Sequence, residues 1–345
     1  MPDRVLLTGI SGFLGGHVAL QLLERGYRVR GSVRNLERAA KVRAMLARHG
    51  ADISRLEFVA LDLLADAGWD AAMDGVRFLQ HTASPFVAEM PRDRGELVRP
   101  AVEGTKRALE AALSAGVERV VLTSSMAAIM YGHDPARTRP FIAADWTDLA
   151  GRDVNAYVES KARAERLAWE IMDGAGRHGD LVAINPGGIL GPLLEDDPGT
   201  SAALIQRLMQ GEVPAAPRIS FIIVDVRDVA ALHVAAMEKP EAGGHRYPTG
   251  SGTWDILEIA DMLRAGLGAD AGRLPRFRIP DWLVRAAALF DPVLRSNLGE
   301  LGVVKHADTA AAEALLGHPF IPAADAVTAT ARSLIEYRLV PKKGL

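Results

Sequence analysis

The sequence predicts an α/β fold, in which a doubly wound parallel sheet is joined to a smaller C-terminal lobe. Short apolar segments typical of buried strands alternate with helical segments over the first two thirds of the chain. A glycine-rich turn at residues 9–15 joins the first strand to the first helix. The alternation is lost after about residue 240, so we expect the chain to leave the sheet there.

Composition limits the possible partners. The chain has 345 residues, of which 49% are hydrophobic, with a formal net charge of −3 and no Lys/Arg-rich block. These values favour a small-molecule partner over nucleic acid or an anionic membrane. There is no cysteine, which excludes disulfides, thiolate metal sites and a cysteine nucleophile, and we expect no metal. No apolar run is long enough to span a bilayer, and a first strand beginning at Arg4 leaves no room for a signal peptide, so we expect a cytoplasmic protein.

The first strand, residues 4–8, leads through Gly9, Gly12 and Gly15 into a helix over residues 13–25. Glycines at this spacing permit a tight turn and let the backbone approach a pyrophosphate at the helix N-terminus, where free N–H groups point outward. The turn therefore predicts a dinucleotide site.

The second strand, residues 27–33, indicates which dinucleotide. Proteins that prefer NAD place an acid near the end of this strand to hold the ribose hydroxyls. Residues 28–36 contain no acid, whereas Arg34 and Lys41 follow the strand. Two cations suit a 2′-phosphate, which favours NADP(H) over NAD(H).

Further strands are expected over residues 56–61, 76–82, 119–123 and 180–185, with helices over 100–115 and around 155–169. In such folds ligands bind at the carboxyl ends of the strands. We interpret His81, inside the fourth strand, as a core or supporting residue rather than a catalytic base.

Tyr157 and Lys161 are four residues apart in the predicted helix and share one face. An ammonium beside a phenol lowers the tyrosine pKa and favours a general acid/base.

The second half of the chain is less regular. Loops over residues 188–220 are candidates for substrate contacts and a lid, with the acidic residues 195–197 as a solvated tip. A strand at 221–224 and a helix at 226–237 follow, with Asp225 and Asp228 as capping or structural acids. We expect the amphipathic stretch 281–290 to pack against the lobe rather than to anchor the protein in a membrane. The expected division is residues 1–186, completed by 219–238, for the cofactor, and 187–218 with 239–345 for the substrate.

The motifs together resemble those of the extended short-chain dehydrogenases/reductases, in the branch of dihydroflavonol reductases, cinnamoyl-CoA reductases and bacterial aldehyde/ketone reductases. The resemblance covers residues 4 to about 335. It is carried by Thr8–Gly15, Val33-Arg34 with Lys41, Asp62-Leu63, His81–Pro85, Thr123-Ser124-Ser125, Tyr157–Lys161, Pro186–Pro192 and Val224–Ala230.

The resemblance implies a Rossmann-type fold, an NADP(H) cofactor and a carbonyl reductase. It implies that Tyr157 donates a proton, that Ser125 orients the carbonyl, and that Lys161 lowers the tyrosine pKa and holds the nicotinamide ribose. Asp62 and Leu63 border the adenine, Ala83 and Pro85 line the path to the nicotinamide, and Pro186 and Ile189 flank it. The remaining residues expected at the cofactor are Thr8, Ser11, Phe13, Leu14, Thr82, Ser84, Thr123, Gly187 and Ser201.

Two departures narrow the substrate. The asparagine with which dihydroflavonol reductases recognise their substrate is replaced by Met130, and residues 155–161 differ from the longer signature of cinnamoyl-CoA reductases. A less specialised carbonyl reductase remains, with an apolar pocket formed by Phe86, Met126 and Met130 beside Ser125 and Tyr157.

Other functions stay open. A nucleotide-sugar epimerase or dehydratase that retains NAD, or a 3β-hydroxysteroid-type dehydrogenase, shares the superfamily. A catalytically silent NADP-sensing protein shares the fold. Relatives are monomers or homodimers, and from the sequence both states stay open for this chain.

Overall fold

The structure is a computed structural model that describes residues 3–84, 93–197, 199, 202–290, 295 and 298–340. Three residues expected at the cofactor or substrate, Pro85, Phe86 and Ser201, lie outside the described residues.

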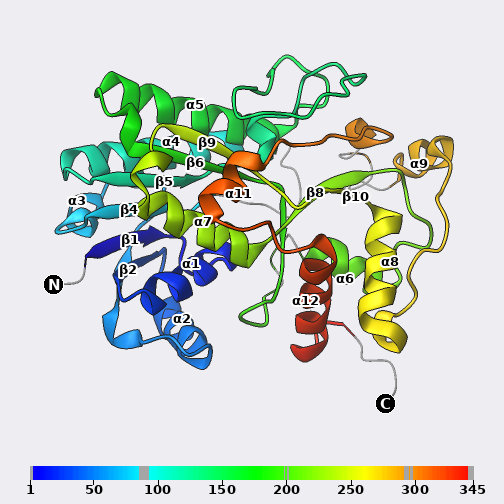
Figure 1. Ribbon diagram of the computed structural model, residues 1–345, viewed down its shortest axis with the longest axis horizontal. Helices are drawn as coiled ribbons and strands as arrows, with labels where there is room; N and C mark the ends of the chain where they lie inside the picture. Colours follow the sequence, from blue (N-terminus) through cyan, green and yellow to red (C-terminus); the bar gives the residue numbers. More distant parts are fainter. Residues whose placement is uncertain are drawn as a thin grey trace.

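A parallel sheet of seven strands forms the centre of the larger lobe (Figure 1). The strand order is β3-β2-β1-β4-β5-β6-β9, so the order reverses beside β1, and the predicted Rossmann-type arrangement is confirmed. The strands are β1 Arg4–Thr8, β2 Arg28–Val33, β3 Leu56–Ala60, β4 Phe78–His81, β5 Arg119–Thr123, β6 Leu181–Pro186 and β9 His245–Thr249.

The seventh strand contradicts one expectation. We expected the chain to leave the sheet after about residue 240, but β9 returns and pairs in parallel with β6 along Val182–Pro186. Its sequence, His245-Arg246-Tyr247-Pro248-Thr249, lacks an apolar run such as that of β1 or β5. An edge strand pairs on one side only and tolerates a proline, so it needs no such run.

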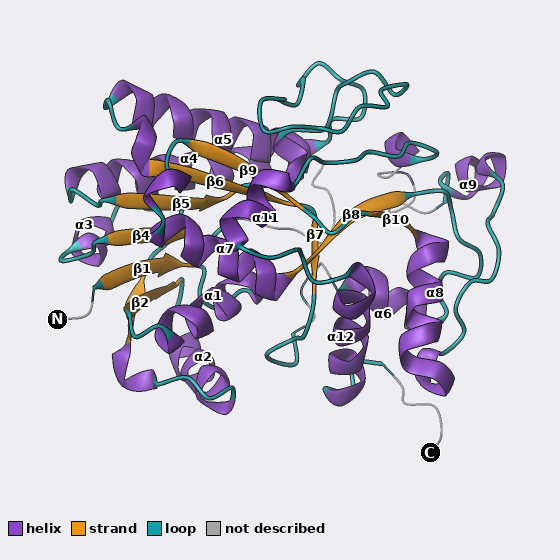
Figure 2. Ribbon diagram, in the orientation of Figure 1, coloured by secondary structure: helices purple, strands orange, loops and turns teal. Residues whose placement is uncertain are grey.

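Helices cover both faces of this sheet (Figure 2). One face carries α1 Phe13–Glu24, α2 Glu37–Arg48, α7 Val226–Glu238 and α11 Ala310–Leu316 over a single apolar cluster. The other face carries α3 Trp69–Met73, α4 Gly95–Ser114 and α5 Ala156–Gly174 over a second cluster. Helix α4 begins five residues before Pro100, the expected start, so the proline lies in its second turn.

The smaller lobe contains a second sheet, β10-β8-β7, and its own apolar core. Its elements are β7 Gly188–Leu190, β8 Ser220–Asp225, β10 Thr253–Asp255, α6 Ala203–Gln210, α8 Ile256–Leu267, α9 Asp281–Ala287 and α12 Ala323–Glu336. The expected strand at 221–224 is therefore part of this sheet, although α7 directly after it packs on α1. The division of the chain into cofactor and substrate parts stays a prediction.

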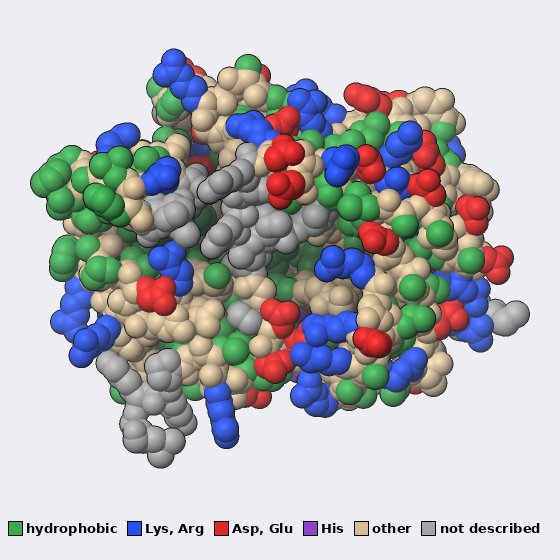
Figure 3. Space-filling view, turned by 180° about the vertical axis from the view of Figure 1, so that it is seen from behind, with side chains coloured by type: hydrophobic (Ala, Val, Ile, Leu, Met, Phe, Trp, Pro, Cys, Tyr) green, Lys and Arg blue, Asp and Glu red, His purple; other side chains and the backbone are tan. Residues whose placement is uncertain are grey.

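Helix α9 is only partly packed. Val284 and Ala288 are buried, but Trp282, Leu289 and Phe290 are 67%, 68% and 89% exposed. Exposed apolar side chains accordingly gather at the left of Figure 3, the end where α9 lies. The expectation that residues 281–290 pack against the lobe thus holds for one face only. None of the described helices is both long and apolar enough to cross a membrane.

Candidate active site

The predicted site residues gather along one edge of the central sheet. The turn after β1, Arg34 after β2, Asp62 after β3, Ala83 after β4, Ser125 after β5 and Gly187 after β6 all follow carboxyl ends of parallel strands. Residues separated by up to 178 positions in sequence are thereby placed at a common edge, as expected for a ligand site in such a sheet.

The glycine turn fits a pyrophosphate. Gly9 has φ +72°, and a Cβ on Gly15 would lie 2.1 Å from the Gly9 carbonyl oxygen, so neither position accommodates a side chain. Gly12 is the exposed N-cap of α1, and no side chain caps this helix end or places an acid in its first turn. Its outward N–H groups are thus left for an anion.

The turn is tied to the neighbouring strand end. Thr8 Oγ1 hydrogen-bonds His81 Nδ1 at 2.9 Å and accepts from the Ala83 backbone N–H at 3.2 Å. Thr82 Oγ1 donates to the Thr8 carbonyl at 2.6 Å. His81 is buried, which lowers its pKa to about 4. His81 is therefore buried and hydrogen-bonded, as expected for a core residue, and its support of the site stays a prediction.

The two cations expected at a 2′-phosphate are in different situations. Arg34 is exposed directly after β2. Lys41 Nζ lies 3.1 Å from both Glu195 and Asp196, and Arg38 lies 2.8 Å from Glu195. Glu195 is only 8% exposed. The expectation of a wholly solvated acidic tip is thus wrong for Glu195, because two cations of α2 draw its carboxylate inward.

Other expected cofactor residues lie around this edge. Asp62 Oδ1 accepts from the Leu64 backbone N–H at 2.9 Å, and Leu63 packs on Gly104 of α4. Leu14 is buried, whereas partly exposed surface remains on Ser11, Phe13, Thr82, Ala83, Ser84, Thr123, Gly187 and Ile189. Pro186 is buried as the last residue of β6.

Ser125 is the second residue after β5 and caps a short 3-10 helix, Met126–Ala128. Its Oγ accepts from the Ala127 backbone N–H at 3.1 Å and from the Tyr157 hydroxyl at 3.4 Å. Because the oxygen accepts both bonds, the serine's own proton can be donated to a third group, such as a carbonyl oxygen.

Helix α5 positions Tyr157 and Lys161. Asn155 caps it by accepting from the Val158 N–H at 3.0 Å, and the following residues are alanine-rich. Lys161 Nζ lies 5.9 Å from the centre of the Tyr157 ring, and Lys161 is 9% exposed while Tyr157 is half-buried. The predicted shared face is therefore present.

The pKa of Tyr157 departs from the expectation. Burial raises the pKa of this phenol, and the hydrogen bond to Ser125 opposes the rise only in part. Burial also lowers the pKa of Lys161 to about 8, against the attraction of Glu165. The predicted net lowering of the tyrosine pKa is thus wrong for this structure, since desolvation of the phenolate dominates.

The two described methionines expected to line the substrate pocket differ in exposure. Met126 is 1% exposed in a cluster with Ile129, Phe141 and Ile222. It is a core residue, so the expectation that it lines the pocket is wrong. Met130 packs on this cluster and keeps exposed surface, so it remains a candidate contact.

The sequence analysis did not identify the polar groups that lie behind Ser125, Tyr157 and Lys161, the proposed catalytic trio. Glu165, Asn185 and Arg246 form a buried network that reaches the Ser124–Ser125 turn. The position of Glu165, one turn after Lys161 in an alanine-rich helix, was the only available signal. Arg246 had none, because it lies on the unpredicted strand β9.

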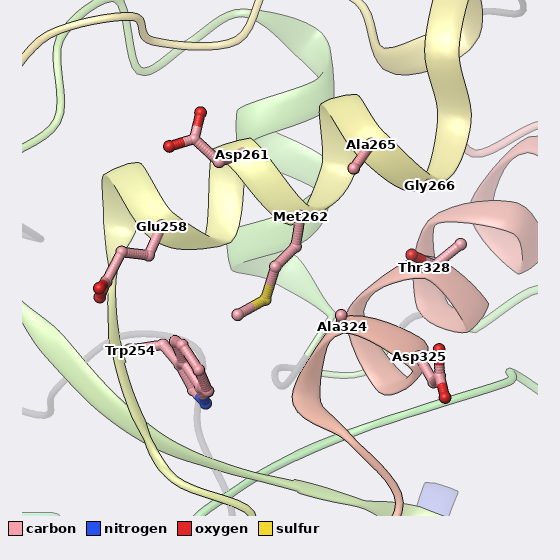
Figure 4. A pocket seen from close by; sticks show the side chains of 9 residues that line it. All are labelled: Trp254, Glu258, Asp261, Met262, Ala265, Gly266, Ala324, Asp325 and Thr328. Atoms are coloured by element: carbon pink, nitrogen blue, oxygen red, sulfur yellow. The ribbon is translucent and has the colours of Figure 1, made fainter.

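A groove of about 550 Å³ lies elsewhere, between α8 and α12 (Figure 4). Trp254 and Met262 form its apolar part, and Glu258, Asp261 and Asp325 stand around it. None of the predicted site residues lines this groove.

The chain is similar to known proteins over most of its length. Residues 5–250 match the model of the NAD dependent epimerase/dehydratase family. The chain is 36% identical over 248 residues to a cinnamoyl-CoA reductase of Medicago truncatula, covering 71% of this chain and 75% of that protein. It is 34% identical over 267 residues to tetraketide alpha-pyrone reductase 2 of Arabidopsis thaliana, covering 76% and 82%.

Solved structures share the fold. The yeast methylglyoxal/isovaleraldehyde reductase in complex with NADPH superimposes with a TM-score of 0.80 at 24% identity, covering 97% of this chain and 99% of that one. The family match and the sequence relatives confirm the predicted resemblance to the reductase branch. The chain belongs to the NAD dependent epimerase/dehydratase family, within the extended short-chain dehydrogenases/reductases.

Proposed function

We propose that the protein reduces an aldehyde or ketone to an alcohol, reversibly, with NADPH as the hydride donor. The observation that carries this proposal is the meeting of three groups at one sheet edge. The Tyr157 hydroxyl lies 3.4 Å from Ser125 Oγ, and Lys161 is buried on the same helix face as the tyrosine. The glycine turn after β1 opens at the same edge.

NADP(H) is the cofactor that these residues suit. The uncapped N-terminus of α1 would hold the pyrophosphate, and Arg34 would face the 2′-phosphate, with no acid in residues 28–36 to oppose it. Lys41 would have to exchange Glu195 and Asp196 for the phosphate. The yeast neighbour in the comparison was solved as an NADPH complex.

The chain's own groups would then handle the carbonyl oxygen. Bound NADPH supplies a hydride to the carbonyl carbon, and negative charge develops on the oxygen. The Tyr157 phenol donates the proton to that oxygen, and the raised pKa keeps this phenol protonated at neutral pH. Ser125 donates its own proton as a hydrogen bond and holds the oxygen beside the phenol. The Lys161 ammonium adds a positive charge where negative charge develops.

The substrate class follows from what surrounds this oxygen site. Met130, the remaining described candidate, presents an apolar side chain, which suits an uncharged carbonyl compound. We therefore propose a broad carbonyl reductase for aromatic or aliphatic aldehydes, ketones or β-ketoesters, rather than an enzyme for a dihydroflavonol or a CoA thioester.

The test is NADPH oxidation by the purified protein across such a panel, with NADH and a cinnamoyl-CoA as comparison arms. We expect turnover of at least one aldehyde or ketone, with NADPH preferred. Protein that retains stoichiometric NAD and consumes no NADPH would instead indicate the epimerase or dehydratase alternative. Preferred use of NADH would overturn the assignment of Arg34.

A further inference from the structure

A buried carboxylate lies directly behind the proposed catalytic residues. Glu165, one helical turn after Lys161 on α5, has a fully buried side chain. Its Oε2 accepts from Asn185 Nδ2 at 2.7 Å and from the Ser124 hydroxyl, and its Oε1 accepts from Arg246 Nε at 2.6 Å. The turn after β5 and the strands β6 and β9, all remote from α5 in sequence, therefore converge on one side chain of this helix.

Arg246 is held as firmly as its partner. Its side chain is 8% exposed, and Nη1 donates to the backbone carbonyls of Ala143 and Asp145 at 2.6 and 2.7 Å. The guanidinium also lies 3.6 Å from the centre of the Trp146 ring. The carboxylate of Glu165 thus stays paired with a positive charge that cannot swing away to solvent.

Stability alone does not explain the buried Glu165–Arg246 ion pair. Desolvating two charges costs roughly as much as their attraction returns, and packed apolar residues often serve as well. In addition, Arg246 Nη2 and Asn185 Oδ1 are buried without a hydrogen-bond partner among the described residues. Each such atom costs about 1–3 kcal/mol. The network is therefore better explained by what it positions.

Two of its bonds reach the catalytic turn. Ser124, which bonds Glu165, directly precedes Ser125, and Asn185 Nδ2 donates to the Ser125 carbonyl at 3.2 Å. Ser124, Lys161 and Glu165 also line one small cavity of about 10 Å³. Glu165 hence borders both the serine turn and the lysine.

We propose that Glu165 is a positioning residue for this site: it fixes the Ser124–Ser125 turn, and its negative charge supports the ammonium of Lys161, with Arg246 holding it in place. The inference rests on the proposed carbonyl reduction. It adds one requirement to that proposal: activity depends on the negative charge of Glu165 as well as on Ser125, Tyr157 and Lys161.

The groups facing Lys161 make Glu165 the decisive charge. From β4, His81 faces the lysine, but burial lowers its pKa to about 4, so it is neutral near pH 7. On α5 itself, Tyr157 stays a neutral phenol because burial raises its pKa. From β9, the Arg246 guanidinium forms an ion pair with Glu165. Burial lowers the pKa of Lys161 to about 8, and the Glu165 carboxylate opposes this fall.

The variant Glu165→Gln tests the proposal, because it keeps the side-chain shape and removes the charge. The pKa of Lys161 should fall further, so the lysine would lose its proton at lower pH. We expect the alkaline limb of the kcat profile for reduction to move down by about one pH unit. The change in Lys161 charge alone should leave kcat almost unchanged at pH 6, lower it about fivefold at pH 8 and approach a tenfold loss at higher pH, while KM for NADPH changes less than about threefold.

Glu159→Gln is the matched control. Glu159 lies on the same helix and pairs with Arg94 and Arg163 at the surface, away from Lys161. Its profile should coincide with that of wild type. A profile of Glu165→Gln that runs parallel to wild type at all pH values would overturn the charge role.

Glu165→Asp covers the case in which the glutamine variant does not fold. It keeps a negative charge near Lys161 but is too short to hold Ser124 and Arg246 together. We expect a lower kcat with an unmoved alkaline limb, and wild-type kcat would refute the positioning role. If Tyr157→Phe is as active as wild type, it is the proposed function that fails, and not this inference.

Discussion

Replacing Tyr157 with phenylalanine removes the proposed proton donor and leaves the ring in place. General acid catalysis contributes about 10²- to 10⁴-fold, so we expect kcat for reduction to fall by that factor, or roughly 3–5 kcal/mol in the barrier. The Ser125 hydroxyl remains and still donates to the oxygen, which is why the loss should not exceed this range. KM for NADPH should change less than about threefold, because the phenol acts on the substrate oxygen.

The same substitution should hardly change stability. The bond from the Tyr157 hydroxyl to Ser125 Oγ is long, at 3.4 Å, and a typical intramolecular hydrogen bond contributes only about 0.5–1.5 kcal/mol net. We therefore expect Tm to change by no more than about 3 °C. A large activity loss with an unchanged melting curve separates a catalytic role from a packing role.

The assay is NADPH oxidation at saturating carbonyl substrate, with a thermal melt on the same preparation. Tyr27→Phe is the control, since its hydroxyl donates to Glu238 at 3.0 Å at the opposite end of the sheet. That variant should keep wild-type kcat. If Tyr157→Phe retains more than a tenth of wild-type kcat, the proton-donor role is refuted.

Two further predictions concern charges. Arg34→Ala should raise KM for NADPH by about 10- to 100-fold and leave KM for NADH nearly unchanged; Lys41→Ala should have a smaller effect, because Glu195 and Asp196 already neutralise Lys41. Lys161→Met should abolish most activity yet raise the free energy of unfolding at pH 7 by up to about 3 kcal/mol, since the buried ammonium has a pKa of about 8 in place of 10.5. Below pH 8, Lys161 is protonated in both the folded and the unfolded chain, so the full cost of burying its ammonium is present. This cost shrinks as pH rises from 8 to 10.5. Urea unfolding of wild type and of Lys161→Met should therefore differ less at pH 10 than at pH 7.

Local sequence patterns predict most of the strands of the central sheet. Apart from β2, strands β1 to β6 contain short apolar runs between turn residues, so the ends of β1 and β5, and with them the glycine turn and Ser125, follow from sequence. The Tyr157–Lys161 pair follows from helical spacing. The direction of the tyrosine pKa does not, because it depends on how deeply the helix is buried, which spacing alone does not report.

What local patterns could not supply is long-range pairing. Strand β9 contains His245, Arg246 and Pro248 and resembles a loop in sequence; it is a strand because the edge of β6 offers it a partner. The inward position of Glu195 likewise depends on Arg38 and Lys41, more than 150 residues earlier. Neither partner is visible within a local window.

Both β9 and the inward position of Glu195 depend on contacts between distant parts of the chain. The same is true of Glu165, whose buried charge the sequence alone did not reveal. Arg246 meets Glu165 only because β9 pairs in register with β6, with Arg246 opposite Ala183. The same β6 strand brings Asn185 to the Ser125 carbonyl. A shift of β9 by one residue would turn Arg246 to the other face of the sheet and leave a buried carboxylate without its cation, a state that costs several kcal/mol. The register of the seventh strand and the charge of Glu165 therefore depend on each other, and the proposed site depends on both.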